Sequence, residues 1–177
     1  MLKKILLALV LALLAFVGYA ATRDGHFRYE RSGVIEAPAE KIYAYISDFH
    51  RGNEWSPYMQ KDPSMKLAYS GTDGQPGAKL EFDGNKDTGS GTLEILRTVP
   101  NREVDIRLTM TKPFHAENLI EYRLVPEGTG TRFSWAMSGD GGLPGKIMAL
   151  LIDCEKMVTK DFETGIANLK RVVESAK

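Results

Sequence analysis

The sequence has 177 residues, of which 43% are hydrophobic, and its 23 basic and 23 acidic side chains cancel in charge. This balance excludes the strongly basic character typical of nucleic-acid-binding domains. The single cysteine, Cys154, excludes an internal disulfide and a cysteine-cluster metal site. After the apolar N-terminal segment about 150 residues remain, enough for a core that needs neither metal nor disulfide. We therefore expect one domain, over residues 25–177, without a cofactor or a nucleic-acid partner.

The N-terminal segment, residues 1–24, carries the strongest targeting signal. Two lysines precede an unbroken apolar run over residues 5–21. As a helix this run is about 25 Å long, the low end of a membrane-spanning length. Small residues also allow signal-peptide cleavage after Ala20, although Tyr19 suits the cleavage site poorly. The sequence favours a single-pass anchor in the cytoplasmic (inner) membrane with the domain facing outward, whereas cleavage would leave a periplasmic or secreted domain.

The periodicity of the remaining chain changes twice. Residues 27–36 alternate like a strand, and "AEKIYAYISDF" then has apolar residues at helical spacing after Pro38. From residue 65 onward, glycine- and proline-rich turns separate further alternating runs. A final helix is predicted over residues 144–174, where apolar residues recur every three or four positions. The predicted strands after the turns are 65–69, 78–82, 91–97, 103–111, 114–125 and 131–138.

This order of elements predicts an α+β fold with a curved antiparallel sheet covered on one side by helices. Alternation assigns an apolar inner face to the sheet, which either packs solidly or encloses a cavity. Asn118 is the unusual member of that face. It either bonds to backbone groups or orients a mostly apolar ligand. The strand residues taken as cavity candidates are Phe82, Phe114, Asn118, Tyr122, Trp135 and Met137.

The stretch "SDFHRGNEWSPY", residues 47–58, could form an active site or the wall of a pocket. It holds an acid, a base and a nucleophile, but hydrolysis needs the nucleophile and base in contact and a third group to orient the base. No G-x-S-x-G elbow is present. Asp48 and Asn53 suit helix caps, and Trp55 and Tyr58 suit a cavity wall. We expect no catalytic residue here.

Three features are similar to those of the SRPBCC (START-like, Bet v 1-like) superfamily, and nearest to its polyketide cyclase/dehydrase branch. They are the order of elements and the segments "APAEKIYAYISDFHRGNEWSPY" and "KIMALLIDCEKMVTKDFETGIANLK". The resemblance covers residues 27–174. It implies a helix-grip fold, in which a seven-stranded sheet grips a long C-terminal helix around a hydrophobic cavity. Members bind lipids, sterols, polyketides or hormones, and a minority are enzymes. Gly52 stands where relatives commonly have a bulky residue, which implies a weaker lid over the cavity mouth.

Two main classes of function follow, and a third alternative is an interaction or stress-related envelope domain with a filled core. One is membrane-tethered binding of a hydrophobic small molecule or lipid. The alternative is a cyclase or dehydratase, which needs a general acid or base in the pocket. The inward faces carry few titratable groups (Tyr29, Tyr122 and Arg31), which favours binding. No pattern predicts a metal site or an oligomeric state. The predicted ligand-binding residues are Trp55, Tyr58, Phe82, Phe114, Asn118, Tyr122, Trp135, Met137, Leu151 and Met157.

Overall fold

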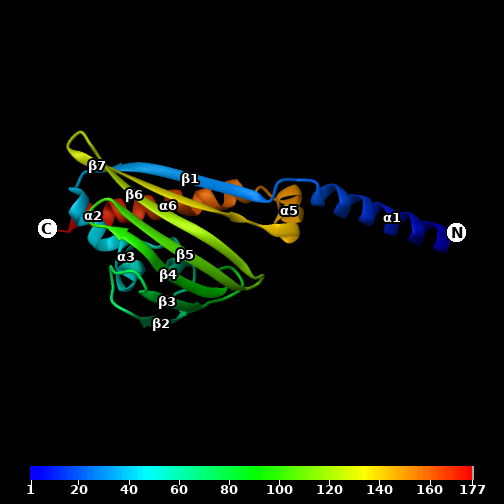
Figure 1. Ribbon diagram of the computed structural model, residues 1–177, viewed down its shortest axis with the longest axis horizontal. Coiled ribbons are helices and arrows are strands. Elements are labelled where there is room, and N and C mark those ends of the chain that lie inside the picture. Colours follow the sequence, from blue (N-terminus) through cyan, green and yellow to red (C-terminus); the bar gives the residue numbers. More distant parts are fainter. Residues whose placement is uncertain (177) are drawn as a thin grey trace.

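The computed structural model describes residues 1–176 and contains a seven-stranded antiparallel sheet (Figure 1). Each predicted strand boundary lies within two residues of the observed one, so alternation located all of these strands. In spatial order the strands are β1 (His26–Ile35), β7 (Gly130–Asp140), β6 (Ala116–Glu127), β5 (Glu103–Lys112), β4 (Ser90–Val99), β3 (Lys79–Asp83) and β2 (Lys66–Ser70).

Helices cover one side of this sheet. The long α6 (Cys154–Ser175) runs beside β1, and the short helices pack against α6 at the end of the sheet opposite the N-terminal helix (Figure 1). The predicted helix-grip α+β fold is therefore confirmed. The short helices are α2 (Ala39–Ile46), η1 (Phe49–Arg51), α3 (Gly52–Trp55) and α4 (Pro57–Lys61).

The apolar stripe of α6 explains why this helix docks on the sheet. Phe162, Ile166, Leu169 and Val173 are spaced by four, three and four residues, so they share one helix face, and all are buried. Phe162 stacks on Trp135 of β7 with ring centroids 4.5 Å apart. Most of the core lies between this stripe and the inner face of the sheet.

The predicted continuous helix over residues 144–174 is wrong in its first third. The segment forms a separate helix, α5 (Gly142–Leu151), and the chain is extended at Ile152 before α6 begins. Asp153 causes the restart, because its side chain accepts a hydrogen bond from the Lys156 backbone amide, 2.9 Å away, and so caps α6. The apolar spacing continues through the break, so periodicity alone did not reveal it.

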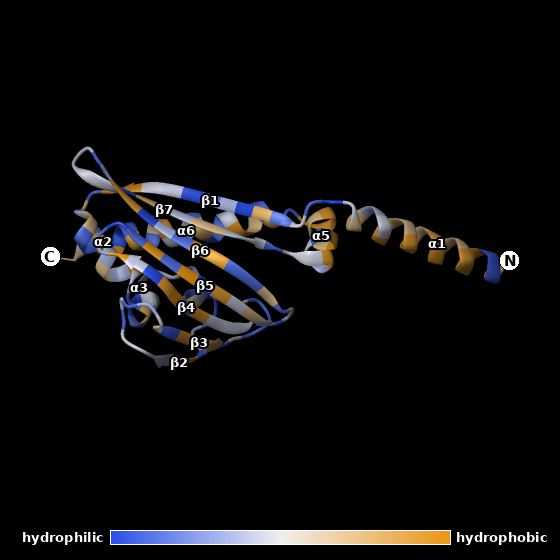
Figure 2. Cartoon of the chain, in the orientation of Figure 1, coloured by the Kyte–Doolittle hydropathy of each residue, from blue (hydrophilic) through white to orange (hydrophobic). Residues whose placement is uncertain are grey.

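The N-terminal helix α1 (Leu2–Ala21) extends away from the domain and contacts α5 (Figure 1). The mean hydropathy of its most apolar 18 residues is 2.3, and 6% of that stretch is buried. Figure 2 shows its hydrophobic colouring beside that of α5. At 1.5 Å per residue the helix is about 30 Å long, close to the hydrocarbon thickness of a bilayer. By length and composition, α1 could cross a membrane.

Gly165 of α6 packs directly against the Trp135 ring, so a larger residue there should destabilise the fold. A Cβ at Gly165 would come within 2.5 Å of Cζ3 of Trp135 and 3.1 Å of Cδ of Pro57. We expect Gly165→Ala to lower the free energy of unfolding by about 1–3 kcal/mol, measured by urea denaturation. Gly145→Ala in α5 is the matched control, because its Cβ would meet no atom within 4 Å. Equal stability of the two variants would contradict this packing.

Candidate ligand-binding cavity

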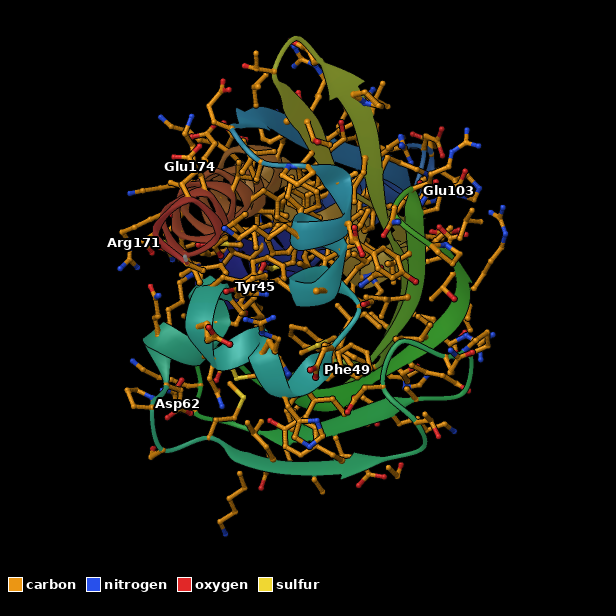
Figure 3. All side chains as sticks on the ribbon, turned by 90° about the vertical axis from the view of Figure 1, so that its left-hand side faces the viewer. Tyr45, Phe49, Asp62, Glu103, Arg171 and Glu174 are labelled. Atoms are coloured by element: carbon orange, nitrogen blue, oxygen red, sulfur yellow. The ribbon has the colours of Figure 1, made fainter. Side chains whose placement is uncertain are left out.

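A cavity of about 290 Å³ lies between the sheet, α6 and the short helices. Figure 3 views the molecule from the end where the short helices lie and labels Tyr45 of α2 and Phe49 of η1. Apolar and aromatic side chains predominate in the wall. The short helices contribute Tyr45, Ile46, Phe49, Trp55, Tyr58 and Met59, and the sheet contributes Leu80, Phe82, Leu93, Ile106, Leu108, Met110, Asn118, Ile120, Tyr122, Trp135 and Met137.

A row of residues crosses the sheet beneath the cavity. Leu80 pairs with Leu93, Leu93 with Leu108, and Leu108 with Asn118, so the four side chains share one face. Asn118 is the polar end of the row. Its Oδ1 lies over Gly139, where a Cβ would come within 2.3 Å of it. The glycine therefore makes room for the amide, which adds one hydrogen-bonding group to an otherwise apolar floor.

Aromatic rings form the wall nearest α3 and α6. Trp135 is central: its ring centroid lies 5.5 Å from that of Trp55, 5.5 Å from that of Tyr122 and 4.5 Å from that of Phe162. The contacts with Trp55 and Tyr122 are edge-on, an arrangement that aromatic quadrupoles favour. The indole N–H groups of both tryptophans are buried and lack hydrogen-bond partners within residues 1–176. This wall is therefore mainly aromatic, with two indole N–H donors that the described residues leave unpaired.

The titratable groups of the wall offer little acid–base chemistry. Burial raises the pKa of the Tyr58 and Tyr122 phenols well above the ordinary value, with smaller contributions from Asp161 and from Tyr58 respectively. Both phenols consequently stay protonated near neutral pH, where they can donate hydrogen bonds but cannot act as bases. Among the described lining residues Asp48 is the single carboxylate, and none is a lysine, arginine, histidine or glutamate.

The structure brings most of the predicted ligand-binding residues together. Residues outside the predicted ligand-binding set also line the cavity, especially on the short helices and on β5. Gly52, which the sequence singled out at the lid, also lines the cavity, and a Cβ there would meet only the Met59 Cε, 3.9 Å away, so the glycine leaves free space in the wall. The helical spacing of Tyr45, Ile46 and Phe49 was the available signal for the others. The predicted residues that line the cavity are Trp55, Tyr58, Phe82, Asn118, Tyr122, Trp135 and Met137.

Three predicted residues lie outside the cavity and are exposed. Phe114 is 58% exposed because it belongs to the turn between β5 and β6, and the strand begins only at Ala116. Leu151 and Met157 are 67% and 55% exposed because they flank the break between α5 and α6, which turns their side chains away from the sheet. Their predicted inward placement is wrong.

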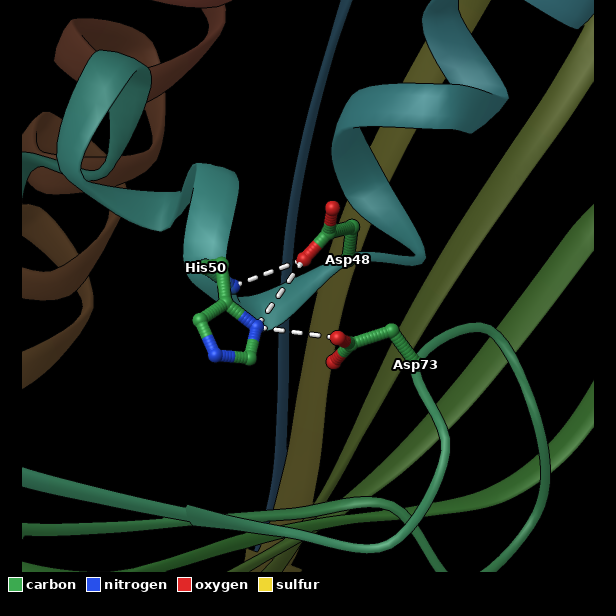
Figure 4. A group of neighbouring side chains, drawn as sticks. All are labelled: Asp48, His50 and Asp73. Carbon is green, nitrogen blue, oxygen red and sulfur yellow. Dashed lines mark hydrogen bonds and ion pairs between the residues drawn. The ribbon is translucent and has the colours of Figure 1, made fainter.

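The stretch at residues 47–58 forms a side-chain cluster that the sequence did not reveal. The His50 Nδ1 lies 2.9 Å from Oδ2 of Asp73 and 3.6 Å from Oδ1 of Asp48 (Figure 4). Asp48 also caps η1 through the His50 backbone amide, as predicted, and the His50 ring stacks on Tyr69 with centroids 4.0 Å apart. Asp73 comes from the loop after β2, so no local pattern predicted the contact.

This cluster connects η1 to β2 rather than assembling a hydrolytic site. The candidate ligand atoms of its three residues lie within 4.8 Å of one another, on partly or fully exposed side chains. Within the described residues Ser56 makes no hydrogen bond to His50, so the nucleophile–base contact that hydrolysis needs is missing. The geometry supports a structural contact near the cavity wall.

Asp62 fixes the loop between β3 and β4 at one end of the cavity. Its carboxylate accepts hydrogen bonds from the Ser64 hydroxyl at 2.7 Å and from the Asn85 amide at 2.7 Å, and these bonds lower its pKa. Since the folded-state pKa lies below the unfolded one, this stabilisation is present above about pH 4 and is lost as the pH falls through the folded-state pKa.

We therefore expect Asp62→Asn to be less stable than the parent at neutral pH, with a difference that shrinks as the pH falls below about 4. Urea denaturation across that pH range measures the difference. Asp87→Asn, in the same loop, is the matched control. A stability difference between Asp62→Asn and the parent that is independent of pH would show that the Asp62 carboxylate does not contribute in this way.

Comparisons with known proteins agree with this architecture. The profile of the family described as "Polyketide cyclase / dehydrase and lipid transport" matches residues 26–174. A search of curated proteins gives no match. The sequence identities to solved structures are low, so these likenesses concern the fold.

Three solved structures illustrate the likeness. A protein from Rhizobium leguminosarum aligns with a TM-score of 0.64 and 14% identity, over 87% of this chain and 98% of its own. Ara h 8.0201 aligns with a TM-score of 0.60 and 14% identity, over 86% and 100%. The Aha1 dimer from Colwellia psychrerythraea aligns with a TM-score of 0.57 and 17% identity, over 85% and 98%. Together with the family match and the cavity, they show that this chain belongs to the polyketide cyclase/dehydrase and lipid transport family, with a Bet v 1-like helix-grip fold.

Proposed function

We propose that this protein binds a hydrophobic small molecule or lipid in its internal cavity, without a catalytic step. The observation that carries the proposal is the apolar cavity of about 290 Å³. Its size is just below the usual range of ligand pockets, roughly 300–1,000 Å³, so it suits a small ligand. The row of Leu80, Leu93 and Leu108 offers apolar contact, and Asn118 at its end offers a hydrogen bond that would orient the ligand.

We further propose that residues 5–21 hold the protein in the cytoplasmic membrane as a single span, with the domain facing outward. The length and hydropathy of α1 support this proposal. Lys3 and Lys4 would remain on the cytoplasmic side. Cleavage after Ala20 is the alternative, and it would leave a periplasmic or secreted binding protein.

The second candidate function, a cyclase or dehydratase, finds less support in the cavity. A reaction of that kind needs a general acid or base that can change its protonation state near the working pH. The buried Tyr58 and Tyr122 phenols have raised pKa values, and Asp48 directs one carboxylate oxygen to the His50 amide. These groups suit hydrogen bonding to a bound molecule better than proton transfer.

Titration with N-phenylnaphthylamine, an uncharged dye that fluoresces in apolar surroundings, tests binding directly. Residues 25–177 should be used, so that neither detergent nor membrane takes up the dye, and near-UV circular dichroism should first show that they are folded. We expect saturable binding of one dye per chain, reversed by fatty acids or other small apolar lipids. A folded domain that shows no saturable uptake would contradict the proposed function.

A further inference from the structure

Large apolar side chains outside α1 are exposed mainly at one end of the molecule. In an antiparallel sheet the β5–β6 turn and the β7–α5 connection lie at the end where β1 begins, and β1 begins just after α1. Figure 1 shows α5 at that end, beside the last turn of α1. We call this set of side chains the apolar end surface; its members are Phe114, Leu143, Leu150, Leu151, Ile152 and Met157.

The helix α5 contributes most of this surface and does not serve the core. None of its ten residues is buried. Its main packing partner is α1, and the Nζ of its single charged residue, Lys146, donates a hydrogen bond to the Ala21 carbonyl oxygen at 3.3 Å. An apolar helix that is left out of the core but fixed against the end of a candidate membrane span needs another apolar environment.

The side chains around the end of α1 are those typical of a membrane–water interface. Tyr19 is 54% exposed, and the Arg23 guanidinium carbon lies 5.7 Å from the centre of its ring. Tyrosine and basic residues are enriched where membrane helices cross the membrane–water interface. Residues 22–25 alone join α1 to β1, a link of at most about 14 Å when fully extended. The apolar end surface therefore lies within reach of the surface of any bilayer that α1 crosses.

We propose that the apolar end surface inserts into the interface of the same bilayer that α1 spans, so that the domain is docked on the membrane in one orientation. This inference rests on the proposed membrane span. Docking buries apolar side chains such as Leu151, and Lys146 lies at the headgroup level, as in interfacial helices.

Docking in this orientation also gives the cavity a route to lipid. Three of the cavity-lining residues lie at one end of the sheet. Thr88 is in the β3–β4 loop, Met110 is near the end of β5, and Asn118 is near the start of β6. All three positions are at the α1 end of the sheet. That end of the cavity would consequently face the bilayer, and an apolar ligand could pass between bilayer and cavity without crossing water.

Site-directed fluorescence on the full chain in phosphatidylcholine and phosphatidylglycerol vesicles tests the docking. Cys154→Ala removes the native thiol, and Leu151→Cys then carries an NBD label, with Leu143→Cys as a second position on the same surface. Val125→Cys is the matched control, because this side chain is 56% exposed and apolar but lies near the far end of β6. We expect blue-shifted emission at positions 151 and 143, quenched by more than half by doxyl-labelled lipids, and little quenching at 125.

The possible outcomes distinguish the docking from the proposed membrane span and from the proposed ligand binding. Vesicle flotation of the protein without quenching at positions 151 and 143 would leave the span intact and overturn the docking. Blue-shifted but unquenched labels would indicate contact with another protein chain and would also overturn it. A chain that does not float with the vesicles would contradict both the span and the docking. Dye uptake by residues 25–177 reports on the cavity independently of all three results.

Discussion

Replacing Phe162 with aspartate is expected to unfold most of the domain. Phe162 is 1% exposed, stacks on Trp135 at 4.5 Å and lines the cavity from α6. The variant would place a charge without a partner in the core and remove one of the main contacts between α6 and the sheet. The expected loss is several kcal/mol, a large part of the stability of a domain of this size. Urea denaturation of residues 25–177, followed by circular dichroism, measures it.

Ala167→Asp is the matched control for this substitution. Ala167 lies on the exposed side of the same helix, five residues further along the chain, so the new carboxylate remains in water. We expect a cost of less than about 1 kcal/mol, mainly from helix propensity. If the Phe162→Asp variant melted like Ala167→Asp, the face of α6 that packs on the sheet would have to be reassigned.

Enlarging Leu108 to tryptophan is expected to abolish most ligand binding while the fold survives. Leu108 lines the cavity, lies between Leu93 and Asn118 in the cross-strand row, and is only partly buried, so an indole there would extend into the cavity that is proposed to hold the ligand. We expect the dye affinity to fall at least about tenfold, which corresponds to ~1.4 kcal/mol. The N-phenylnaphthylamine titration measures this loss.

The neighbouring residue provides the control. Thr109 follows Leu108 on β5, so its side chain points to the opposite face of the sheet, and it does not line the cavity. Thr109→Trp should bind the dye as the parent does. Retention of full affinity by a folded Leu108→Trp variant would mean that ligands bind elsewhere on the molecule.

Features with a regular repeat could be predicted from the sequence. Alternation located all seven strands and assigned Asn118, Tyr122 and Trp135 to the inner face, because the period of two is set by the pleat itself. Helical spacing correctly identified Phe162 and Ile166 as core residues. The family resemblance supplied the way in which sheet and helix combine, and the family match supports it.

Features that depend on one local bond or on distant residues could not be predicted in the same way. A single cap at Asp153 divides the last helix, and this division exposes Leu151 and Met157 although both fit the apolar repeat. The contact of His50 with Asp73 joins residues 23 apart through a loop whose course no pattern specifies. Such details arise from tertiary structure, which overrides local periodicity.

Native mass spectrometry of the full chain, purified from membranes in mild detergent, tests the central claim most directly. The proposed function predicts a species heavier than the bare chain by the mass of one small apolar molecule. That species should be lost in Leu108→Trp and retained in Thr109→Trp. Detection of the bare chain alone, from a folded protein that also fails to take up the dye, would contradict the claim that this cavity binds a hydrophobic ligand.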